Sequence, residues 1–93
     1  MSYDLRWRLS AENDLHALPR DVQERVLLRV EALARNPRPS ASTSLKGTLA
    51  GLRRLRVGDY RIAYLVDDAD FWIGILAVGH RSKFYENLRR SNT

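Results

Sequence analysis

Residues 52–66 constrain this chain more than any other stretch, because two apolar strand candidates are separated there by only two residues. The connection is Gly58 and Asp59, and such a pair between β-branched and aromatic residues is typical of a tight hairpin turn. A two-residue turn also sets the register of the strands that it joins. The sequence therefore predicts a β-hairpin in which Arg56 lies opposite Arg61.

Each face of this predicted hairpin has its own chemical character. Residues directly opposite each other in an antiparallel pair project from the same face of the sheet. One face is basic and comprises Arg54, Arg56 and Arg61. The other face is apolar and comprises Leu55, Val57, Tyr60, Ile62, Tyr64 and Val66. The apolar face is therefore the predicted core face. On the basic face, like charges placed opposite each other destabilise the hairpin by about 0.2–1 kcal/mol per pair.

Three explanations of the basic face follow from the residues alone. It is a solvated surface that discourages edge-to-edge aggregation, it pairs with the chain's own aspartates at 67, 68 and 70, or it binds an anion. Fourteen of the sixteen basic residues are arginine, whose planar guanidinium suits bidentate phosphate contacts. The net charge is +5, and the positive charge is gathered in residues 41–66 and 80–93. We favour a polyanionic partner.

The rest of the chain predicts a single α+β domain over residues 1–93. Alternating apolar and charged residues at 3–9 predict a strand. A short helix capped by Ser10 and ending before Pro19, followed by a longer helix to Asn36, predicts a helical hairpin. The order is completed by a three-stranded antiparallel meander at about 52–57, 60–66 and 71–79, and by a short C-terminal helix at about 82–90. The meander completes a small sheet that begins with the N-terminal strand.

Some segments of this predicted fold bear on the candidate site. Residues 38–44 are polar and predict a loop. Residues 71–79 are apolar at both parities, which predicts a strand covered on both faces. Simple alternation would place Arg81 on the apolar side, so we expect the strand to end at Gly79 or to contain a bulge that re-aims Arg81. The helix arginines at 20, 25, 29 and 35 alternate with acidic residues and indicate a solvated face.

The composition excludes several classes of function. There is no cysteine, which removes disulfide frameworks and thiolate chemistry, and no apolar stretch approaches the roughly 20 residues of a membrane span. The opening MSYDLRW lacks the pattern of a secretory signal, so we expect a cytoplasmic protein without membrane association. The two histidines, His16 and His80, do not form a cluster with carboxylates at metal-ligand spacing. We therefore expect neither a metal nor another cofactor.

The run LKG…LRRLRVGDYRIAY, followed by AVGHRSKFYENL, resembles the RelE/ParE superfamily of bacterial toxins and, within it, the RelE-type mRNA interferases. The resemblance covers nearly the whole chain and implies a RelE-like fold of the microbial RNase type. It also implies a toxin of a type II toxin–antitoxin system that cuts mRNA in the ribosomal A site without a metal. In that chemistry a 2′-hydroxyl attacks the adjacent phosphate, which leaves a 2′,3′-cyclic phosphate and a 5′-hydroxyl.

The resemblance also implies which residues form the site. The family combines basic hairpin residues, an arginine after the last strand and a tyrosine near the C-terminus. By motif, the implied catalytic residues are Arg54, Arg61, Arg81 and Tyr85. The implied RNA-binding residues are Lys46, Arg53, Arg56, His80 and Lys83. Relatives often have a large aromatic residue at the position of Arg53, which predicts a different arrangement at the start of this hairpin.

Cleavage by this route needs a base, cations at the phosphorane and a group at the leaving 5′-oxygen. In the implied site Tyr85 is the base, and Arg54 and Arg61 stabilise the phosphorane. The group at the leaving oxygen is Arg81, acting electrostatically, or His80. A purely structural role stays open for both Tyr85 and His80. An aromatic residue near a terminus is often a packing residue, and a histidine at a strand end is often a hydrogen-bonded rim residue.

The resemblance implies specific partners. These are the ribosome with its mRNA, and a cognate antitoxin, RelB-like or of another family, that covers the basic surface. Contacts with the ribosome are the alternative to a solvated face for the helix arginines at 20, 25, 29 and 35. Operator DNA would be contacted only through the toxin–antitoxin complex. The alternatives are a ParE-like inhibitor of DNA gyrase and a catalytically inactive relative that binds an antitoxin. The complete set of basic residues with Tyr85 favours the endoribonuclease, because ParE-like members usually lack that set.

Overall fold

The computed structural model describes residues 2–91 as three α-helices, one short 3-10 helix and a five-stranded sheet. The order along the chain is β1 (Asp4–Trp7), α1 (Leu9–His16), α2 (Arg20–Leu33), β2 (Ser42–Ser44), η1 (Gly47–Leu49), β3 (Arg53–Val57), β4 (Tyr60–Asp67), β5 (Trp72–His80) and α3 (Phe84–Ser91). The predicted α+β class and element order are confirmed, with β2 as an additional strand. No helix within residues 2–91 has the length and apolar character needed to cross a membrane.

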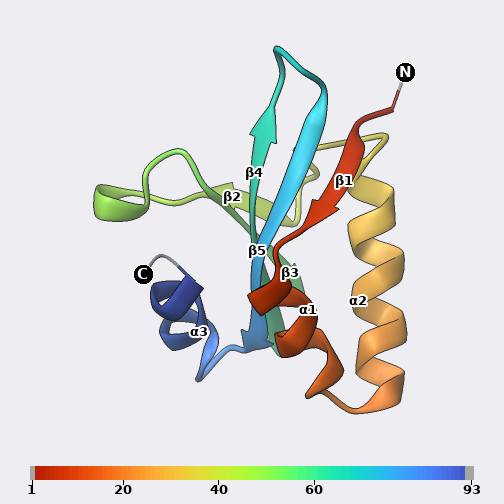
Figure 1. Cartoon of the computed structure of the whole chain (residues 1–93), viewed down its shortest axis with the longest axis vertical. Helices are drawn as coiled ribbons and strands as arrows, with labels where there is room; N and C mark the ends of the chain where they lie inside the picture. The colour runs from red at the N-terminus through yellow and green to blue at the C-terminus, as the bar shows by residue number, and fades with distance from the viewer. Residues whose placement is uncertain (1, 92–93) are drawn as a thin grey trace.

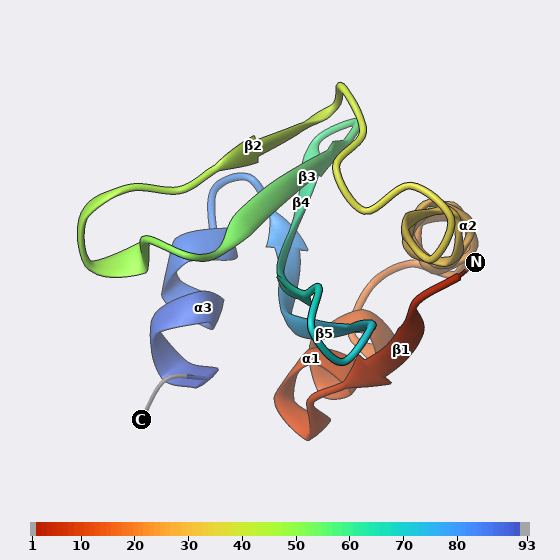
Figure 2. The same ribbon diagram turned by 90° about the horizontal axis from the view of Figure 1, so that it is seen from above.

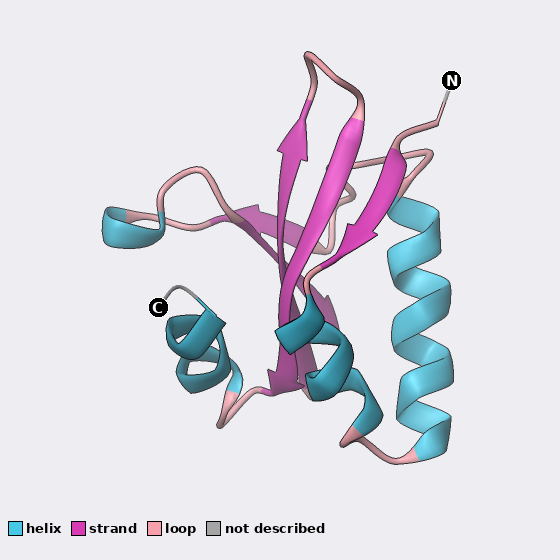
Figure 3. Ribbon diagram, viewed as in Figure 1, coloured by secondary structure: helices cyan, strands magenta, loops and turns pink. Residues whose placement is uncertain are grey.

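The strands form one mixed sheet in the order β1-β5-β4-β3-β2 (Figure 3). β1 runs parallel to β5 and the other neighbouring pairs are antiparallel, so the predicted antiparallel meander is confirmed. β2 corrects the prediction of a loop at 38–44, because Ser42 pairs with Leu55 and Ser44 pairs with Arg53. Its three residues are all small and polar, and so short an edge strand leaves no apolar alternation in the sequence.

Helices cover both faces of the sheet (Figure 1, Figure 2). α1 and α2 pack on one face, over a core that includes Leu55, Ile62, Tyr64, Ile73, Ile75 and Val78. α3 and the loop around η1 pack on the opposite face, over a second core that comprises Ala63, Leu76, Ala77, Phe84 and Leu88. The prediction that the last strand is covered on both sides is confirmed, because residues 73–79 are all buried.

The helical hairpin forms as predicted, with one change at its start. α2 follows Pro19 and buries an apolar stripe at helical spacing, which comprises Val22, Val26, Val30 and Leu33. α1 begins at Leu9, because Arg8 adopts the extended conformation of an N-cap residue directly after β1. Ser10, the predicted N-cap, is therefore inside the helix. The buried stripe of α2 fixes the orientation of its exposed side relative to the sheet.

The hairpin of β3 and β4 has the predicted register. Arg56 lies opposite Arg61, and Arg54 lies opposite Ala63. Gly58 has a φ of 60°, which is the left-handed conformation required at the first position of a two-residue type II′ turn. Because Ala63 belongs to the core beneath α3, the basic face of the hairpin lies on the α3 side of the sheet.

β5 contains a bulge, which is one of the two arrangements expected from the position of Arg81. Its register with β4 shifts between Ile75 and Ala77, so that Leu76 is an extra residue. An extra residue reverses the face that each later residue occupies. β5 continues to His80, one residue beyond the predicted end, and the reversal places Arg81 on the same side as the basic face of the hairpin.

Candidate active site

The basic face of β3 and β4 brings three guanidinium groups to one surface. Arg54 and Arg56 project from β3, and Arg61 projects from β4. Arg61 Nη1 donates hydrogen bonds to the carbonyl oxygens of Gly58 at 2.8 Å and Tyr60 at 2.9 Å. These bonds hold the guanidinium of Arg61 against the turn.

Arg81 reaches the same place from the end of β5. Its backbone N–H donates to the carbonyl oxygen of Asp59 at 2.8 Å, which ties it to the turn. An open cavity of about 470 Å³ lies here and is lined by Arg29, Ala41, Arg56, Gly58, Asp59, Arg61 and Arg81. Small-ligand sites typically occupy about 300–1,000 Å³. We call Arg54, Arg56, Arg61 and Arg81 the basic cluster.

Arg61 is the electrostatic centre of the basic cluster. Burial lowers the pKa of its guanidinium below the usual range, and the positive charges of Arg54, Arg56 and Arg81 lower it further. Asp59 acts in the opposite direction and is the weakest of these influences. Arg61 still carries its charge near neutral pH, because arginine loses its proton only under strongly basic conditions. The cluster therefore keeps a net positive charge, which Asp59 offsets only in part and which attracts phosphate groups.

Tyr85 approaches the basic cluster from α3. Arg54 Nη1 donates a hydrogen bond to the phenol oxygen at 2.9 Å. The ring of Tyr85 contacts the ring of fully buried Phe84 edge-on, with 4.8 Å between centroids. Tyr85 itself is 38% exposed. The expected packing role and the approach to the basic face therefore occur together.

The start of α3 is held close to β5, and this fixes the position of Tyr85. Asn87 Nδ2 donates to the carbonyl oxygen of Val78 at 2.9 Å. A Cβ atom on Gly79 would lie 2.8 Å from Asn87 Nδ2 and 3.3 Å from Phe84 Cα. Such short distances require something to move, so glycine at this position permits the close approach of helix and strand.

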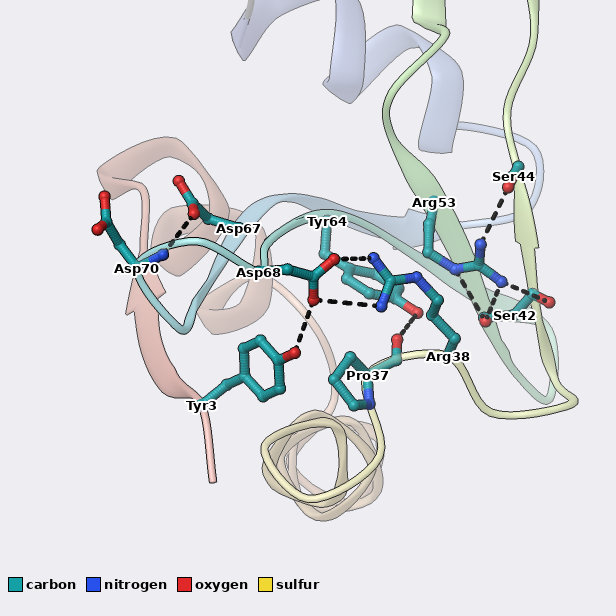
Figure 4. Close-up of polar contacts among 10 residues, drawn as sticks. All are labelled: Tyr3, Pro37, Arg38, Ser42, Ser44, Arg53, Tyr64, Asp67, Asp68 and Asp70. Carbon is teal, nitrogen blue, oxygen red and sulfur yellow. Dashed lines mark hydrogen bonds and ion pairs between the residues drawn. The ribbon is translucent and has the colours of Figure 1, made fainter. Parts of the chain in front are cut away.

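Arg53 does not join the basic cluster. It lies opposite Tyr64 and therefore projects from the apolar face. Its guanidinium donates to the hydroxyl oxygens of Ser42 and Ser44, at 2.9 Å in each case, on the neighbouring strand β2 (Figure 4). The edge strand that the sequence did not predict thus supplies the partners that allow an arginine at this position.

The other three predicted RNA-binding residues outside the hairpin also lie apart from the basic cluster. His80 is opposite Tyr60 on the apolar parity, and the two rings meet edge-on with centroids 5.4 Å apart. His80 and Lys83 line a separate groove between α1 and α3. Lys46 is exposed immediately before η1. Of the five residues predicted to bind RNA, Arg56 alone lines the cavity described above.

The aspartates of the β4–β5 turn bond to other groups (Figure 4), and they do not neutralise the basic cluster. Asp68 accepts hydrogen bonds from Arg38 Nη2 at 2.8 Å and from Tyr3 Oη at 2.6 Å, and these contacts lower the pKa of its carboxyl. Asp67 Oδ1 accepts from the backbone N–H of Asp70 at 2.8 Å. Within residues 2–91, no carboxylate lies within the 4.0 Å of an ion pair from any arginine of the basic cluster.

The cavity contains one arginine that was not among the predicted site residues. Arg29 comes from α2, where alternating charges indicated a solvated face. Periodicity identifies the exposed side of a helix but does not say which other element that side borders. The available signal was the spacing of Arg25 and Arg29, which places two arginines one turn apart on the same side of the helix.

The groups gathered at the basic cluster suit the binding of a phosphodiester. Guanidinium groups donate paired hydrogen bonds to phosphate oxygens, and a phenol can transfer a proton when a cation stabilises its ionised form. In the part of the chain that the structure describes, no three histidine, aspartate or glutamate side chains come together in a way that could hold a metal ion.

Comparisons with known proteins agree on one family. A family model described as the ParE toxin of the type II toxin–antitoxin system parDE matches residues 5–85. Toxin RelG of Mycobacterium tuberculosis is 35% identical over 86 residues, which cover 91% of this chain and 98% of that toxin. A chain of the RelBE2 toxin–antitoxin complex from M. tuberculosis has a TM-score of 0.80 and 34% identity, over 87% of this chain and 100% of that one. The archaeal RelE–RelB complex from Pyrococcus horikoshii gives a TM-score of 0.76 and 31% identity, over 89% and 99%.

Proposed function

Because the chain belongs to the RelE/ParE superfamily of toxins from type II toxin–antitoxin systems, we propose that it is a ribosome-dependent endoribonuclease that cleaves mRNA in the A site. In the proposed reaction the 2′-oxygen of one nucleotide attacks its 3′-phosphorus, and the bond from that phosphorus to the next 5′-oxygen breaks. The 2′-hydroxyl loses a proton to a base, and the leaving 5′-oxygen takes up a proton from solvent. The products are a 2′,3′-cyclic phosphate and a 5′-hydroxyl.

Tyr85 is the proposed base. The hydrogen bond that its phenol oxygen accepts from Arg54 supports this role, because it holds that oxygen beside the arginines that are proposed to bind the phosphate. The partial exposure of Tyr85 supports it as well, since a nucleotide must reach the oxygen. A tyrosine buried wholly against Phe84 would not be able to act in this way.

The remaining roles belong to the arginines. Arg54 and Arg61 bind the non-bridging oxygens of the phosphate and stabilise the extra negative charge of the phosphorane, and Arg56, which lines the same cavity as Arg61, binds the RNA beside them. Arg81 assists the leaving 5′-oxygen electrostatically, because arginine releases a proton reluctantly. We propose Arg81 for this position in preference to His80, which lines the groove between α1 and α3.

One observation supports the proposal most directly: Arg54 links Tyr85 to the rest of the basic cluster. It donates to the phenol at 2.9 Å, and its charge acts on Arg61. A base and several phosphate-binding cations must lie within the span of one phosphodiester if they are to act on the same bond. Positive groups without carboxylate partners also keep their full charge for an incoming phosphate.

A cognate antitoxin is the proposed partner that controls this activity. The relatives from M. tuberculosis and P. horikoshii were solved as toxin–antitoxin complexes. An acidic or amphipathic segment of an antitoxin would neutralise the basic cluster and block access to Tyr85. Contact with operator DNA is proposed only through that complex.

A second candidate function is inhibition of DNA gyrase, and the name of the matching family model favours it. Primer extension on a translated message, with and without ribosomes, separates the two candidates. The endoribonuclease proposal expects new 5′ ends inside codons, only where ribosomes are present. Intact mRNA alongside broken chromosomal DNA would establish the gyrase alternative, and growth arrest with neither lesion would contradict both.

Tyr85→Phe tests the proposed base. The ring and its packing on Phe84 remain, whereas the oxygen is lost, so growth arrest and cleavage should both be relieved with antitoxin binding retained. Tyr3→Phe is the matched control, because Tyr3 bonds Asp68 at the other end of β4 and should remain toxic. Full toxicity of Tyr85→Phe would remove the phenol from the reaction.

A further inference from the structure

Two arginines of α2 border the β3–β4 turn. Arg29 lines the same cavity as Arg56, Arg61 and Arg81. Arg25 lies one helical turn earlier, and its Nη1 is 3.4 Å from the point that a Cβ atom on Gly58 would occupy. The two side chains therefore extend the positive surface from the hairpin across to α2.

The positions of these side chains are set by the helix and not by ion pairs. α2 is fixed by its buried stripe, which includes Val26 and Val30. Acidic residues occur on the same helix, at positions 21, 24 and 31, but no described carboxylate lies within ion-pair distance of Arg25 or Arg29. Both side chains are exposed. Arg29 thus lines the cavity and Arg25 lies beside the turn that borders it, and neither forms an ion pair with a described carboxylate.

The charge around the turn calls for a ligand longer than one phosphate. The basic cluster already supplies four guanidinium groups, and one scissile phosphate has only two non-bridging oxygens for them. Single-stranded RNA places successive phosphates several ångströms apart, so a chain bound with one phosphate at Arg61 must direct its neighbours along an adjacent surface. The α2 side of the cavity offers such a surface with the required charge.

We propose that Arg25 and Arg29 bind RNA backbone phosphates next to the one held by the basic cluster, so that α2 forms one wall of an RNA-binding groove. This inference rests on the proposed function for the identity of the polyanion. The phosphates belong either to the message beside the scissile bond or to ribosomal RNA around the A site. The chemistry of recognition is the same in both cases, and separate binding measurements distinguish them.

The test compares two double variants of the full chain that remove the same charge. Arg25→Gln with Arg29→Gln removes the proposed contacts, and Arg20→Gln with Arg35→Gln removes two other exposed arginines that do not line the cavity. One measurement uses a single-stranded RNA with a 2′-deoxy nucleotide at the cleavage site, and the other uses ribosomes without message. Each is a titration repeated across a range of salt concentrations, and thermal unfolding verifies that every variant is folded.

Each lost phosphate contact should reduce the slope of log K against log salt by about 0.7, so two contacts should reduce it by about 1.4. The same relation predicts about 25-fold weaker binding at 0.1 M salt. A loss confined to the RNA titration assigns the contacts to the message, and a loss confined to ribosomes assigns them to ribosomal RNA.

The control double variant should keep affinity within a few-fold of the wild type. Equal losses in the two double variants, or unchanged binding in both titrations, would overturn the inference, as would a wild-type chain that binds neither probe. A wild-type chain that binds RNA through Arg25 and Arg29 but cuts no message would retain the inference and remove the endoribonuclease proposal. Cleavage lost in Tyr85→Phe, together with normal binding by the Arg25 and Arg29 double variant, would retain the endoribonuclease proposal and remove the inference.

Discussion

The two turns at the ends of β4 carry opposite charges and treat them in opposite ways. At the β4–β5 turn, Asp68 binds both Arg38 and Tyr3, and Asp67 accepts a backbone hydrogen bond. At the β3–β4 turn, four arginines lie together without a carboxylate partner in the described part of the chain. The same strand therefore connects a turn whose charges are satisfied internally to a turn whose charges are not.

The difference indicates what each turn is for. Satisfied charges stabilise the fold in which they occur, whereas uncompensated like charges lower its stability and make the binding of an opposite charge more favourable. A sequence selected only for folding would place an acidic residue or a threonine opposite Arg56. Activity and stability should therefore respond differently to changes at the two turns, and this can be measured.

The largest expected effect comes from removing one arginine at each turn. Arg61→Ala should lower the cleavage rate about 100-fold or more, because it removes a donor to the developing negative charge. Its melting temperature should change little, because the loss of the hydrogen bonds from Arg61 to the turn is offset by relief of the repulsion from Arg54, Arg56 and Arg81. Arg38→Ala should leave cleavage unchanged and lower the melting temperature by no more than a few degrees. Rates from ribosome-dependent primer extension and thermal unfolding test the pair, and parallel losses of activity and stability in both variants would refute the comparison.

Arg56→Glu should make the basic turn behave more like the acidic one. It replaces a like-charge pair with Arg61 by an opposite-charge pair, so the free energy of unfolding should rise by about 0.5 kcal/mol, or about 2–4 °C in melting temperature. RNA binding should weaken at the same time. Arg56→Gln is the control and should give a smaller gain. Because Arg56 is exposed, the gain should be screened and should disappear in 1 M salt, and a gain that persists would have another cause.

The smallest effect is the pH dependence of the acidic turn. The hydrogen bond from Arg38, followed by that from Tyr3, lowers the pKa of Asp68, so its contribution to stability is present above the unfolded value near 3.9 and is lost as the pH falls. The pKa of Tyr3 is raised chiefly because its proton is shared with Asp68, so its contribution is present below about pH 10 and is lost as the pH rises through the folded value.

Urea unfolding of the wild type and Asp68→Asn across the pH range measures this contribution. The difference between their free energies of unfolding should be constant between about pH 5 and 9 and should shrink beyond both limits. Asparagine keeps an acceptor for Tyr3 and Arg38, so the comparison isolates the charge. A difference that does not change with pH would show that the carboxylate charge contributes nothing here.

The hairpin was predictable because its turn is local. Gly58 and Asp59 form a two-residue connection, and this connection sets the pairing of Arg56 with Arg61. The same register places Leu55 and Ile62 on the buried face. The same register also places Arg53 opposite Tyr64 and therefore away from the basic face. Counting along one strand was enough for these features.

Features that depend on distant parts of the chain were not predictable in the same way. β2 has only three polar residues, and its pairing with β3 gives it no apolar pattern of its own. The position of Arg29 beside the turn depends on how α2 packs across the sheet, which helical periodicity does not specify. The bulge in β5 was one of two expected arrangements, because alternation indicated a reversal near Arg81 without identifying the residue.

That bulge has a consequence for how related chains should be aligned. Leu76 is the residue that β5 has in excess over β4, so the strand can gain or lose one amino acid there without changing which side Arg81 faces. The insertion or deletion of one residue elsewhere in β5 would instead reverse the side of the sheet that Arg81 faces. A change of length at Leu76 would therefore shift the number of Arg81 counted from the N-terminus by one, whereas its distance counted from the end of the strand would stay the same.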